Sequence, residues 1–365
     1  MFHFYFVLHR DFKNNELKTI FKSLASFFFF YHNPHMENTK ITIIGTGSWG
    51  TALAISLHNA RKNVHLWGRR TELVDELCAL RHSPYLPGAF IPYELPITND
   101  VNEITNSDII LWAIPVQQSQ QLLHTLGNYI PTNAPIIICS KGLELESRQP
   151  LSILLKKMFS NSVGILSGPN FADEVAKGLP AASTLAFKDL ELAKKLSHQL
   201  RHSAFRIYAH HDVIGVELAG ALKNVIAIAS GIVMGKELGQ NCLATLITRA
   251  SAEISRLTCT LGGIKETRQT LAGIGDLILT CSSAKSRNTS LGIALAQGQT
   301  LEDILKNRKN VTEGIATAKV AFELATHHHV YTPIIHAVHD ILYMGKPIND
   351  VVQSLLEHQQ EQELE

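Results

Sequence analysis

The sequence has almost no net charge, because 33 lysines and arginines balance 32 aspartates and glutamates and leave a formal charge of +1 at pH 7. This balance gives no electrostatic basis for a nucleic acid or an anionic membrane surface as the main partner. The five cysteines are scattered without a CxxC pair, and the eighteen histidines include no HExxH pattern. We therefore expect neither a metal site nor a disulfide framework, and the cysteine usage favours a reducing, cytoplasmic location.

The first 35 residues lack an uninterrupted apolar span, although they hold nine of the fifteen phenylalanines. Charged residues such as Arg10, Asp11 and Lys13 separate the apolar residues of this segment, so we expect no stable membrane insertion. Residues 1–35 also lack the arrangement of a signal peptide, which has one apolar run and a small-residue cleavage site. Two interpretations stay open: the true start is Met36, just before the first predicted strand, or residues 1–35 form an arm that associates with a membrane. We expect residues 1–35 not to be part of the fold.

The chain of 365 residues, 45% of them hydrophobic, is long enough for about two domains. Strand-like segments occur at residues 41–44, 64–67, 109–114, 135–139 and 163–166, and helical patterns separate most of them. Strands that alternate with helices are typical of a mostly parallel sheet. After about Tyr208 only helical patterns follow. The sequence thus predicts an α/β domain at residues 36–212 and an all-α domain at residues 213–357.

Three glycines follow the first predicted strand, in the stretch ITIIGTGSWGTALAISL. Between a strand and a helix, Gly45 would allow a tight turn, Gly47 would let the backbone approach a pyrophosphate, and Gly50 would let the helix pack on the strand. The N–H groups of the helix N-terminus would then face the phosphates. This context predicts a Rossmann-type dinucleotide-binding domain, with a glycine-rich turn that binds nothing as the alternative.

The choice of dinucleotide depends on the end of the second predicted strand, about twenty residues after Gly50, where an acidic residue would favour NAD. The sequence has Arg69 and Arg70 there instead. Because guanidinium groups suit a 2′-phosphate, we expect NADPH/NADP to be preferred and NADH/NAD to be used as well. The alternative is an exposed loop without a ligand.

A long apolar helical pattern, GVELAGALKNVIAIASGIVMG, contains only two charged residues, Glu217 and Lys223. They are six residues apart and therefore lie on different faces. Small neighbours one turn from Lys223, namely Ala219, Gly220 and Ala227, leave room for a ligand. A desolvated lysine has a lowered pKa and can act as a general base, so Lys223 is the candidate catalytic residue. Alternatively, its ammonium group extends into solvent.

A polar cluster before a later predicted helix has the features of an anion site. Ser286 is a natural N-cap, which places Arg287 and Asn288 in the first helical turn, where a phosphate would meet N–H groups and a guanidinium. Asp276, ten residues earlier, could pair with a buried lysine. An ordinary helix cap is the alternative for Ser286.

Two loops follow predicted strands, at the edge where open α/β sheets bind their ligands. Lys141 lies in SKGLE, after the strand at 135–139. Asn170 lies in SGPNFADEVAKGLP, after the strand at 163–166, and is placed to cap the next helix. The alternatives are an ordinary surface charge for Lys141 and no more than a cap for Asn170.

Seven motifs occur in an order that resembles the bacterial NAD(P)-dependent glycerol-3-phosphate dehydrogenase family, over about residues 40–350. They are GTGSWGTALA, SKGLE, SGPNFADEVAKGLPAA, GVELAGALKNVIAIASGI, TLAGIGDLILTC, SRN and VTEG. The resemblance implies a small-molecule reaction, the reversible reduction of dihydroxyacetone phosphate to sn-glycerol 3-phosphate, which supplies phospholipid synthesis. It also makes a homodimer plausible.

The motifs and the resemblance together give an expected set of site residues, with Lys223 as the proton acceptor. The residues expected at the cofactor are Gly45, Gly47, Ser48, Trp49, Gly50, Arg69, Arg70, Lys141, Ala172, Arg287, Val311 and Glu313. The residues expected at the substrate are Lys141, Gly168, Asn170, Lys223, Asp276, Ser286, Arg287 and Asn288.

Two departures from the family pattern stand out. Asn170 occupies a position where serine or threonine is usual, and the extension at residues 1–35 has no counterpart, which favours Met36 as the start. Two other functions stay open. A β-hydroxyacid dehydrogenase would share the glycine loop but does not predict an anion site at KSRN. A non-catalytic dinucleotide sensor would leave Lys223 without a role.

Overall fold

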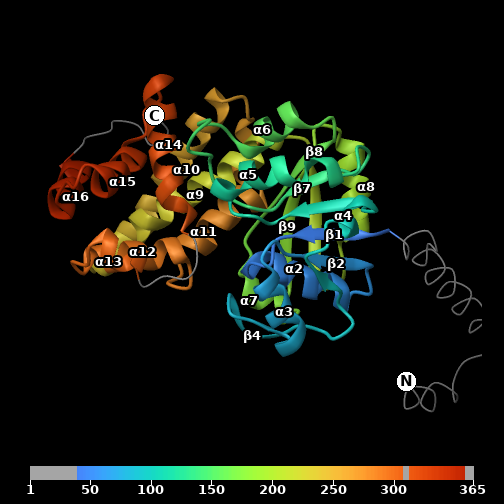
Figure 1. The fold of residues 1–365 in the computed structure, drawn as a ribbon. Coiled ribbons are helices and arrows are strands. Elements are labelled where there is room, and N and C mark those ends of the chain that lie inside the picture. Colours follow the sequence, from blue (N-terminus) through green and yellow to red (C-terminus); the bar gives the residue numbers. More distant parts are fainter. Residues whose placement is uncertain (1–38, 307–311, 358–365) are drawn as a thin grey trace, which may run out of the picture. The chain divides into compact units, whose positions relative to one another are not determined.

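The structure, a computed structural model, describes residues 39–306 and 312–357. From Lys40 on, the described residues form one compact unit that contains a sheet and a group of helices (Figure 1). The strands of the sheet are β1 (Ile41–Ile44), β2 (Val64–Trp67), β5 (Ile97–Thr98), β6 (Ile109–Trp112), β7 (Ile136–Ile138), β8 (Val163–Ser167), β9 (Ala181–Ala186) and β10 (Phe205–His210). Their order across the sheet is β10-β9-β8-β7-β6-β1-β2-β5. A separate hairpin consists of β3 (His82–Ser83) and β4 (Leu86–Phe90).

The central strand β1 illustrates why these residues form a buried sheet. Ile41 lies opposite Val64 of β2 on one side and Ile109 of β6 on the other, and both pairings are parallel. Because successive side chains of a strand point to opposite faces, Ile43 and Ile44 belong to two different core clusters. Only the β8–β9 pair of this sheet is antiparallel, so the prediction of a mostly parallel sheet is confirmed.

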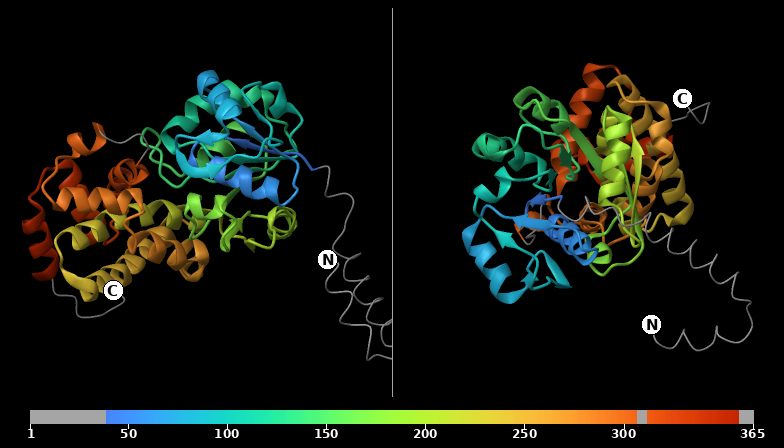
Figure 2. Two further views of the ribbon diagram at one scale, coloured as in Figure 1. Left: turned by 90° about the horizontal axis from the view of Figure 1, so that it is seen from below. Right: turned by 90° about the vertical axis from the view of Figure 1, so that its right-hand side faces the viewer.

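Helices cover both faces of the sheet (Figure 2). Their bounds are α2 (Ser48–Asn59), α3 (Thr71–Leu80), α4 (Asn102–Thr105), α5 (Val116–Leu126), η2 (Gly127–Tyr129), α6 (Leu151–Met158), α7 (Ala172–Ala176) and α8 (Leu190–Leu200). Apolar residues of α2, α3 and α8 share one core cluster with the sheet, and those of α4, α5 and α6 share the other. The described residues after His210 contain helices but no further strand, as predicted.

The helical part of the chain surrounds one long helix, α9 (Val213–Gly235). The other segments are α10 (Gly239–Thr260), η3 (Lys265–Gln269), η4 (Leu271–Gly275), α11 (Asp276–Cys281), α12 (Arg287–Ala296), α13 (Leu301–Lys306), α14 (Glu313–His327), α15 (Pro333–Tyr343) and α16 (Ile348–Glu357). Helices α9 and α12 approach so closely that a Cβ atom at Gly292 would lie 2.0 Å from the Ile228 carbonyl oxygen. This close approach brings the N-terminal part of α12 alongside α9.

By length and composition alone, α9 could cross a membrane, since the mean hydropathy over an 18-residue stretch of this helix is 1.6. In the structure, however, 89% of that stretch is buried inside the protein. The apolar sequence of α9 is therefore accounted for by its place at the centre of the helical core.

The expected set of strands needs correction. The strand expected at 109–114 ends at Trp112, and β9 and β10 were absent from the expected strands, as were the short β5 and the β3–β4 hairpin. Strand β9 has the sequence AASTLA, and its small residues give little local indication of a strand. Its pairing with β8 and β10 accounts for its extended structure. Helix α9 begins at Val213, but the two-domain division stays a prediction. The expectation for residues 1–35 lies outside the described residues.

Candidate active site

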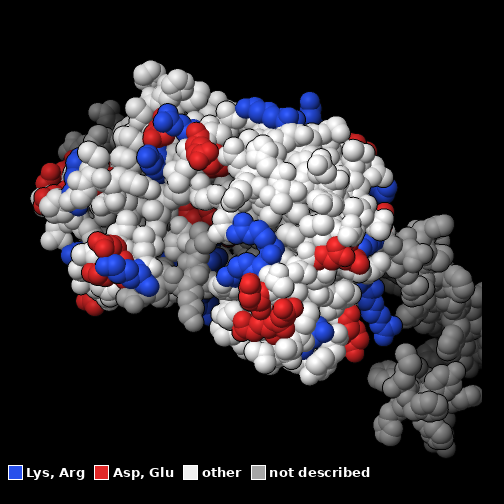
Figure 3. Space-filling model, in the orientation of Figure 1, with Lys and Arg blue, Asp and Glu red and all other residues white. Residues whose placement is uncertain are grey.

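The carboxyl ends of the parallel strands gather the predicted site residues. Gly45 directly follows β1, Arg69 follows β2, Lys141 follows β7 and Gly168 follows β8. The chain continues from β1 to β2 on one side and returns to β6 on the other, which creates the crevice where such sheets bind ligands. Lysine and arginine side chains gather at the rim of a hollow between the sheet and the helices (Figure 3).

The glycine turn after β1 has the geometry expected of a pyrophosphate site. Gly45 has a φ of +125°, and a Cβ atom at Gly50 would lie 2.0 Å from the Gly45 carbonyl oxygen, so neither position accepts a side chain. A Cβ atom at Gly47 would meet no heavy atom within 4 Å, which leaves open space beside the backbone. Gly47 is the N-cap of α2 and provides no side-chain cap, so the helix N–H groups are available to an anion.

Other expected cofactor residues lie around this turn. Ser48 and Trp49 form the first turn of α2, and the indole Nε1 of Trp49 is buried without a hydrogen-bond partner among the described residues. Such an orphaned donor fits a site completed by a ligand. Ala172 begins α7 and is half-buried, whereas Arg69 and Arg70 are exposed. Val311 lies outside the described residues.

A cluster of three charged side chains lies where α9 meets the sheet. Lys223 Nζ lies 3.1 Å from Asp276 Oδ1, and Lys141 Nζ lies 2.6 Å from Asp276 Oδ2. The side chains of Lys223 and Asp276 are only 10% and 2% exposed. Lys141 Nζ also donates to the Gly168 carbonyl oxygen at 2.9 Å. Lys223 is therefore buried and paired rather than extended into solvent, and Asp276 holds two ammonium groups together.

Burial and charge shift the pKa values of this cluster. Burial, helped by the nearby positive charge of Lys141, lowers the pKa of Lys223 to about 8, although the carboxylate of Asp276 opposes this effect. Burial alone would raise the pKa of Asp276, but the ammonium groups of Lys141 and Lys223 outweigh it and lower that pKa. A lysine with a lowered pKa beside a carboxylate whose pKa is also lowered is the arrangement that a general acid–base needs.

Two residues of the cluster were missed by sequence reasoning. Thr280 accepts a hydrogen bond from Lys223 Nζ at 2.6 Å and donates to Asp276 Oδ1 at 3.1 Å. Asn224 donates from Nδ2 to the Lys141 carbonyl oxygen at 3.0 Å. Thr280 lies one helical turn after Asp276, a spacing that places both side chains on one face and could have revealed it.

The second charged residue of α9, Glu217, has a different role. Its Oε1 accepts a hydrogen bond from the Ser152 N–H at 3.0 Å, at the N-terminus of α6. Burial raises the pKa of Glu217 to about 7, although this hydrogen bond and the positive charge of Lys156 oppose the shift. Glu217 therefore joins two helices and belongs to the framework, not to the Lys223 cluster.

The predicted anion cluster lies at the N-terminus of α12. Ser286 caps this helix by accepting from the Thr289 N–H, as predicted. Asn288 is buried, with Nδ2 donating to Asn224 Oδ1 at 2.9 Å and Oδ1 accepting from the Gly314 N–H at 3.1 Å. One N–H of this amide remains for a ligand. The bond to Asn224 connects the cluster to the helix that carries Lys223.

Arg287 and Glu313 lie beside this cluster. Arg287 is exposed to solvent, yet the protein atoms around it hinder its solvation and lower its pKa, an effect that Glu313 opposes. Glu313 Oε1 accepts from the Val116 N–H at 2.9 Å, at the start of α5, and Oε2 is buried without a hydrogen-bond partner among the described residues. Burial raises the pKa of Glu313 to about 6. An exposed arginine near an acceptor that has no partner among the described residues is a setting for a ligand with anionic and hydroxyl groups.

The expectation that Asn170 caps the next helix is wrong. Helix α7 has Phe171 at its N-cap position, and Asn170 Nδ2 instead donates to the Ala182 carbonyl oxygen at 3.1 Å and to Ser183 Oγ at 2.8 Å, both in β9. The amide nitrogen is therefore engaged, and Oδ1 is left buried without a partner among the described residues. Asn170 thus offers an acceptor where a serine or threonine would also offer a donor.

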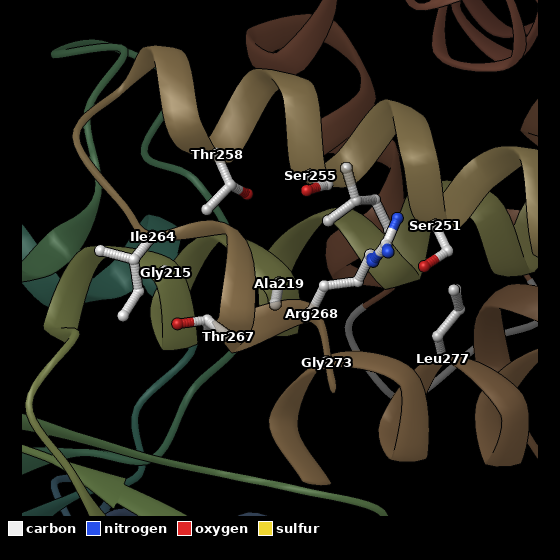
Figure 4. A pocket seen from close by; sticks show the side chains of 11 residues that line it. Gly215, Ala219, Ser251, Ser255, Thr258, Ile264, Thr267, Arg268, Gly273 and Leu277 are labelled. Atoms are coloured by element: carbon white, nitrogen blue, oxygen red, sulfur yellow. The ribbon is translucent and has the colours of Figure 1, made fainter. Parts of the chain in front are cut away.

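A separate cavity lies between α9 and α10, with a volume of about 20 Å³. Residues of α10 line it on one side and residues of α9, η3 and α11 on the other, with Arg268 among them (Figure 4). This volume accommodates about one water molecule and is too small for a dinucleotide or a sugar phosphate. In the described parts of the chain, no group of three histidine, cysteine or acidic side chains is placed to hold a metal ion.

Comparisons with known proteins agree with these geometric features. Residues 40–193 match the family model for the N-terminus of NAD-dependent glycerol-3-phosphate dehydrogenase, and residues 212–353 match the model for its C-terminus. The chain is 42% identical to glycerol-3-phosphate dehydrogenase [NAD(P)+] of Parvibaculum lavamentivorans and 45% identical to that of Gluconobacter oxydans, in each case over 87% of this chain and 96% of the relative.

Among solved structures, glycerol-3-phosphate dehydrogenase from Coxiella burnetii superposes with a TM-score of 0.84 at 35% identity, over 88% of this chain and all of that one. The two family models cover both the sheet with its glycine turn and the helices with Lys223. The chain therefore belongs to the NAD-dependent glycerol-3-phosphate dehydrogenase family.

Proposed function

We propose that the protein catalyses the reversible reduction of dihydroxyacetone phosphate to sn-glycerol 3-phosphate with NADPH or NADH. The observation that carries this proposal is the buried cluster of Lys223, Asp276 and Lys141 at the carboxyl edge of a sheet whose glycine turn fits a pyrophosphate. The cluster supplies a proton donor that is poised near neutral pH beside a site for an anionic ligand. The product would serve phospholipid synthesis.

Lys223 carries out the proton transfer. When held at the glycine turn after β1, NAD(P)H would supply the hydride for C2 of dihydroxyacetone phosphate. The Lys223 ammonium donates a proton to the carbonyl oxygen, becomes the neutral amine and regains a proton from solvent. In the oxidation of glycerol 3-phosphate, the neutral amine accepts the hydroxyl proton instead. Asp276 holds Lys223 through the contact at 3.1 Å, and Thr280 orients the same nitrogen through the hydrogen bond at 2.6 Å.

The remaining expected residues position the ligands. Arg287, Asn288 and the N-terminus of α12 bind the substrate phosphate, which holds C2 near the cofactor. Gly168 and Asn170 complete the substrate side at the end of β8, where the Asn170 acceptor suits a substrate hydroxyl. Arg69 and Arg70 favour NADPH over NADH. A homodimer and a cytoplasmic location stay predictions.

The proposal is tested by adding dihydroxyacetone phosphate to the full-length protein and NADPH and following the absorbance of NADPH. We expect absorbance to fall, and to fall much more slowly with unphosphorylated dihydroxyacetone because the anion site then has no ligand. Turnover of a β-hydroxyacid but not of dihydroxyacetone phosphate would favour a related dehydrogenase. Cofactor binding without turnover of any of these substrates would favour a dinucleotide sensor.

A further inference from the structure

The two arginines at the end of β2 differ in how they are held. Arg70 precedes α3, where its carbonyl oxygen accepts from the Val74 N–H at 3.0 Å. Its Nη2 donates to the Tyr85 hydroxyl at 2.7 Å, and its Cζ lies 5.6 Å from the centre of the Tyr85 ring. The Arg69 side chain forms no hydrogen bond or ion pair with the described residues. Arg70 is therefore held at both backbone and side chain, whereas the Arg69 side chain is not held in this way.

The β3–β4 hairpin brings Tyr85 back to this position. Helix α3 ends at Leu80, and Arg81 has a φ of +54°, which turns the chain back toward the sheet. Arg81 Nη1 donates to the Pro92 and Leu95 carbonyl oxygens at 3.2 and 3.1 Å and so holds the segment that follows β4. The Tyr85 ring is half-buried and packs against the same core cluster as Trp49 of the glycine turn. Tyr85 is thus anchored to the domain before any ligand arrives.

We propose that Tyr85 is a positioning residue that preorganises Arg70 for the 2′-phosphate of NADP(H), and thereby contributes to the choice between NADPH and NADH. This inference rests on the proposed function. Arginine has five N–H donors, so the bond to Tyr85 leaves others for a phosphate, and the Tyr85 hydroxyl keeps its own hydrogen as a further donor. A free arginine loses rotamer freedom when it binds, and an arginine that is already held loses less.

The test compares steady-state kinetics of Tyr85→Phe and the wild type with NADPH and with NADH. Tyr85→Phe keeps the ring and removes only the hydroxyl, so we expect KM for NADPH to rise about three- to tenfold, the range for ordering one flexible side chain. KM for NADH and both kcat values should change by less than about twofold. The matched control is Tyr93→Phe, which alters an exposed tyrosine next to the same hairpin and should leave both cofactors unaffected.

A double substitution separates positioning from a structural role. Arg70→Ala should raise KM for NADPH at least as much as Tyr85→Phe, and Tyr85→Phe should add nothing in the Arg70→Ala background, because no guanidinium is left to hold. Equal changes for both cofactors, no change for NADPH, or full additivity with Arg70→Ala would overturn the inference. If the protein turns over no dihydroxyacetone phosphate, the proposed function fails. Calorimetric titration with NADP and NAD then still tests Tyr85, through the ratio of the two dissociation constants in Tyr85→Phe and in the wild type.

Discussion

At the end of β1 the protein offers a ligand backbone N–H groups and open space, whereas at α9 it offers charged side chains in a largely buried cluster. The glycine turn contains no charge, and a Cβ atom added at Gly47 would have no heavy atom within 4 Å apart from those of its chain neighbours. The α9 cluster has two ammonium groups on one carboxylate that is only 2% exposed. In the proposed function, cofactor binding at the glycine turn depends on the path of the backbone, and proton transfer at α9 depends on individual side chains.

Lys223→Ala should produce the largest effect. We expect kcat to fall at least about a hundredfold, the usual scale for the loss of a general acid–base, while NADPH binding stays nearly intact. Kinetics and a fluorescence titration of NADPH measure the two quantities. Glu217→Gln is the matched control, since it removes the other buried charge of α9 but only affects the contact with α6, and its kcat should match the wild type. A Lys223→Ala enzyme with near-normal kcat would show that Lys223 does not transfer the proton and would remove it from the mechanism.

Asp276→Asn should damage both stability and catalysis. It leaves two buried or half-buried ammonium groups without a counter-charge, and removing one partner of a buried ion pair typically costs about 3 kcal/mol in the free energy of unfolding. We also expect the pKa of Lys223 to fall further, because the attraction that opposes burial is lost. Urea unfolding measures the first effect. Unchanged stability would show that the carboxylate does not hold the cluster together.

Gly47→Ala tests the backbone-based site. The added methyl group meets no protein atom, so the free energy of unfolding should stay within about 0.5 kcal/mol of the wild type. The same methyl group would occupy the space for the pyrophosphate, so KM for NADPH and NADH should rise together by about tenfold. Normal binding of both cofactors by the variant would show that the pyrophosphate does not bind at Gly47.

Arg69→Ala should have the smallest effect and should affect only one cofactor. Loss of one charge-assisted hydrogen bond, worth about 1.5–3 kcal/mol, should lower kcat/KM for NADPH about tenfold and leave NADH nearly unchanged. The comparison is made at low salt, where exposed charges are least screened. If the wild type prefers NADH, or the variant keeps the same preference, the arginine is an ordinary surface charge.

Sequence reasoning succeeded where the relevant signal is local. The glycine turn is encoded within six consecutive residues, and the alternation of β1, β2, β6, β7 and β8 with helices follows from their sequence patterns. Ser286 was identified as an N-cap because capping depends on residue type and immediate position. Lys223 stood out because it is a charge in an apolar helix, and the structure confirms that it is buried.

The contacts that complete the site could not be predicted in this way. Lys141 and Asp276 are 135 residues apart, and the packing of α11 against α9, and of α9 against β8, brings them together. A pairing of Asp276 with a lysine was expected, but not that it would hold two. Asn170 was assigned to a helix cap because asparagine commonly has that role, yet β9, which was also missed, provides its partners. Tertiary pairing outweighed local preference in both cases.

The central claim is that Lys223 exchanges the proton, and the pH dependence of kcat/KM in the two reaction directions tests it most directly. Burial lowers the pKa of Lys223 to about 8. Oxidation of glycerol 3-phosphate needs the neutral amine, so its kcat/KM should rise with pH and level off above about 8. Reduction of dihydroxyacetone phosphate needs the ammonium, so its kcat/KM should fall above about the same pH. Both inflections should vanish in Lys223→Ala. Persistence of the inflections in that variant, or the same direction of change for both reactions, would contradict the account.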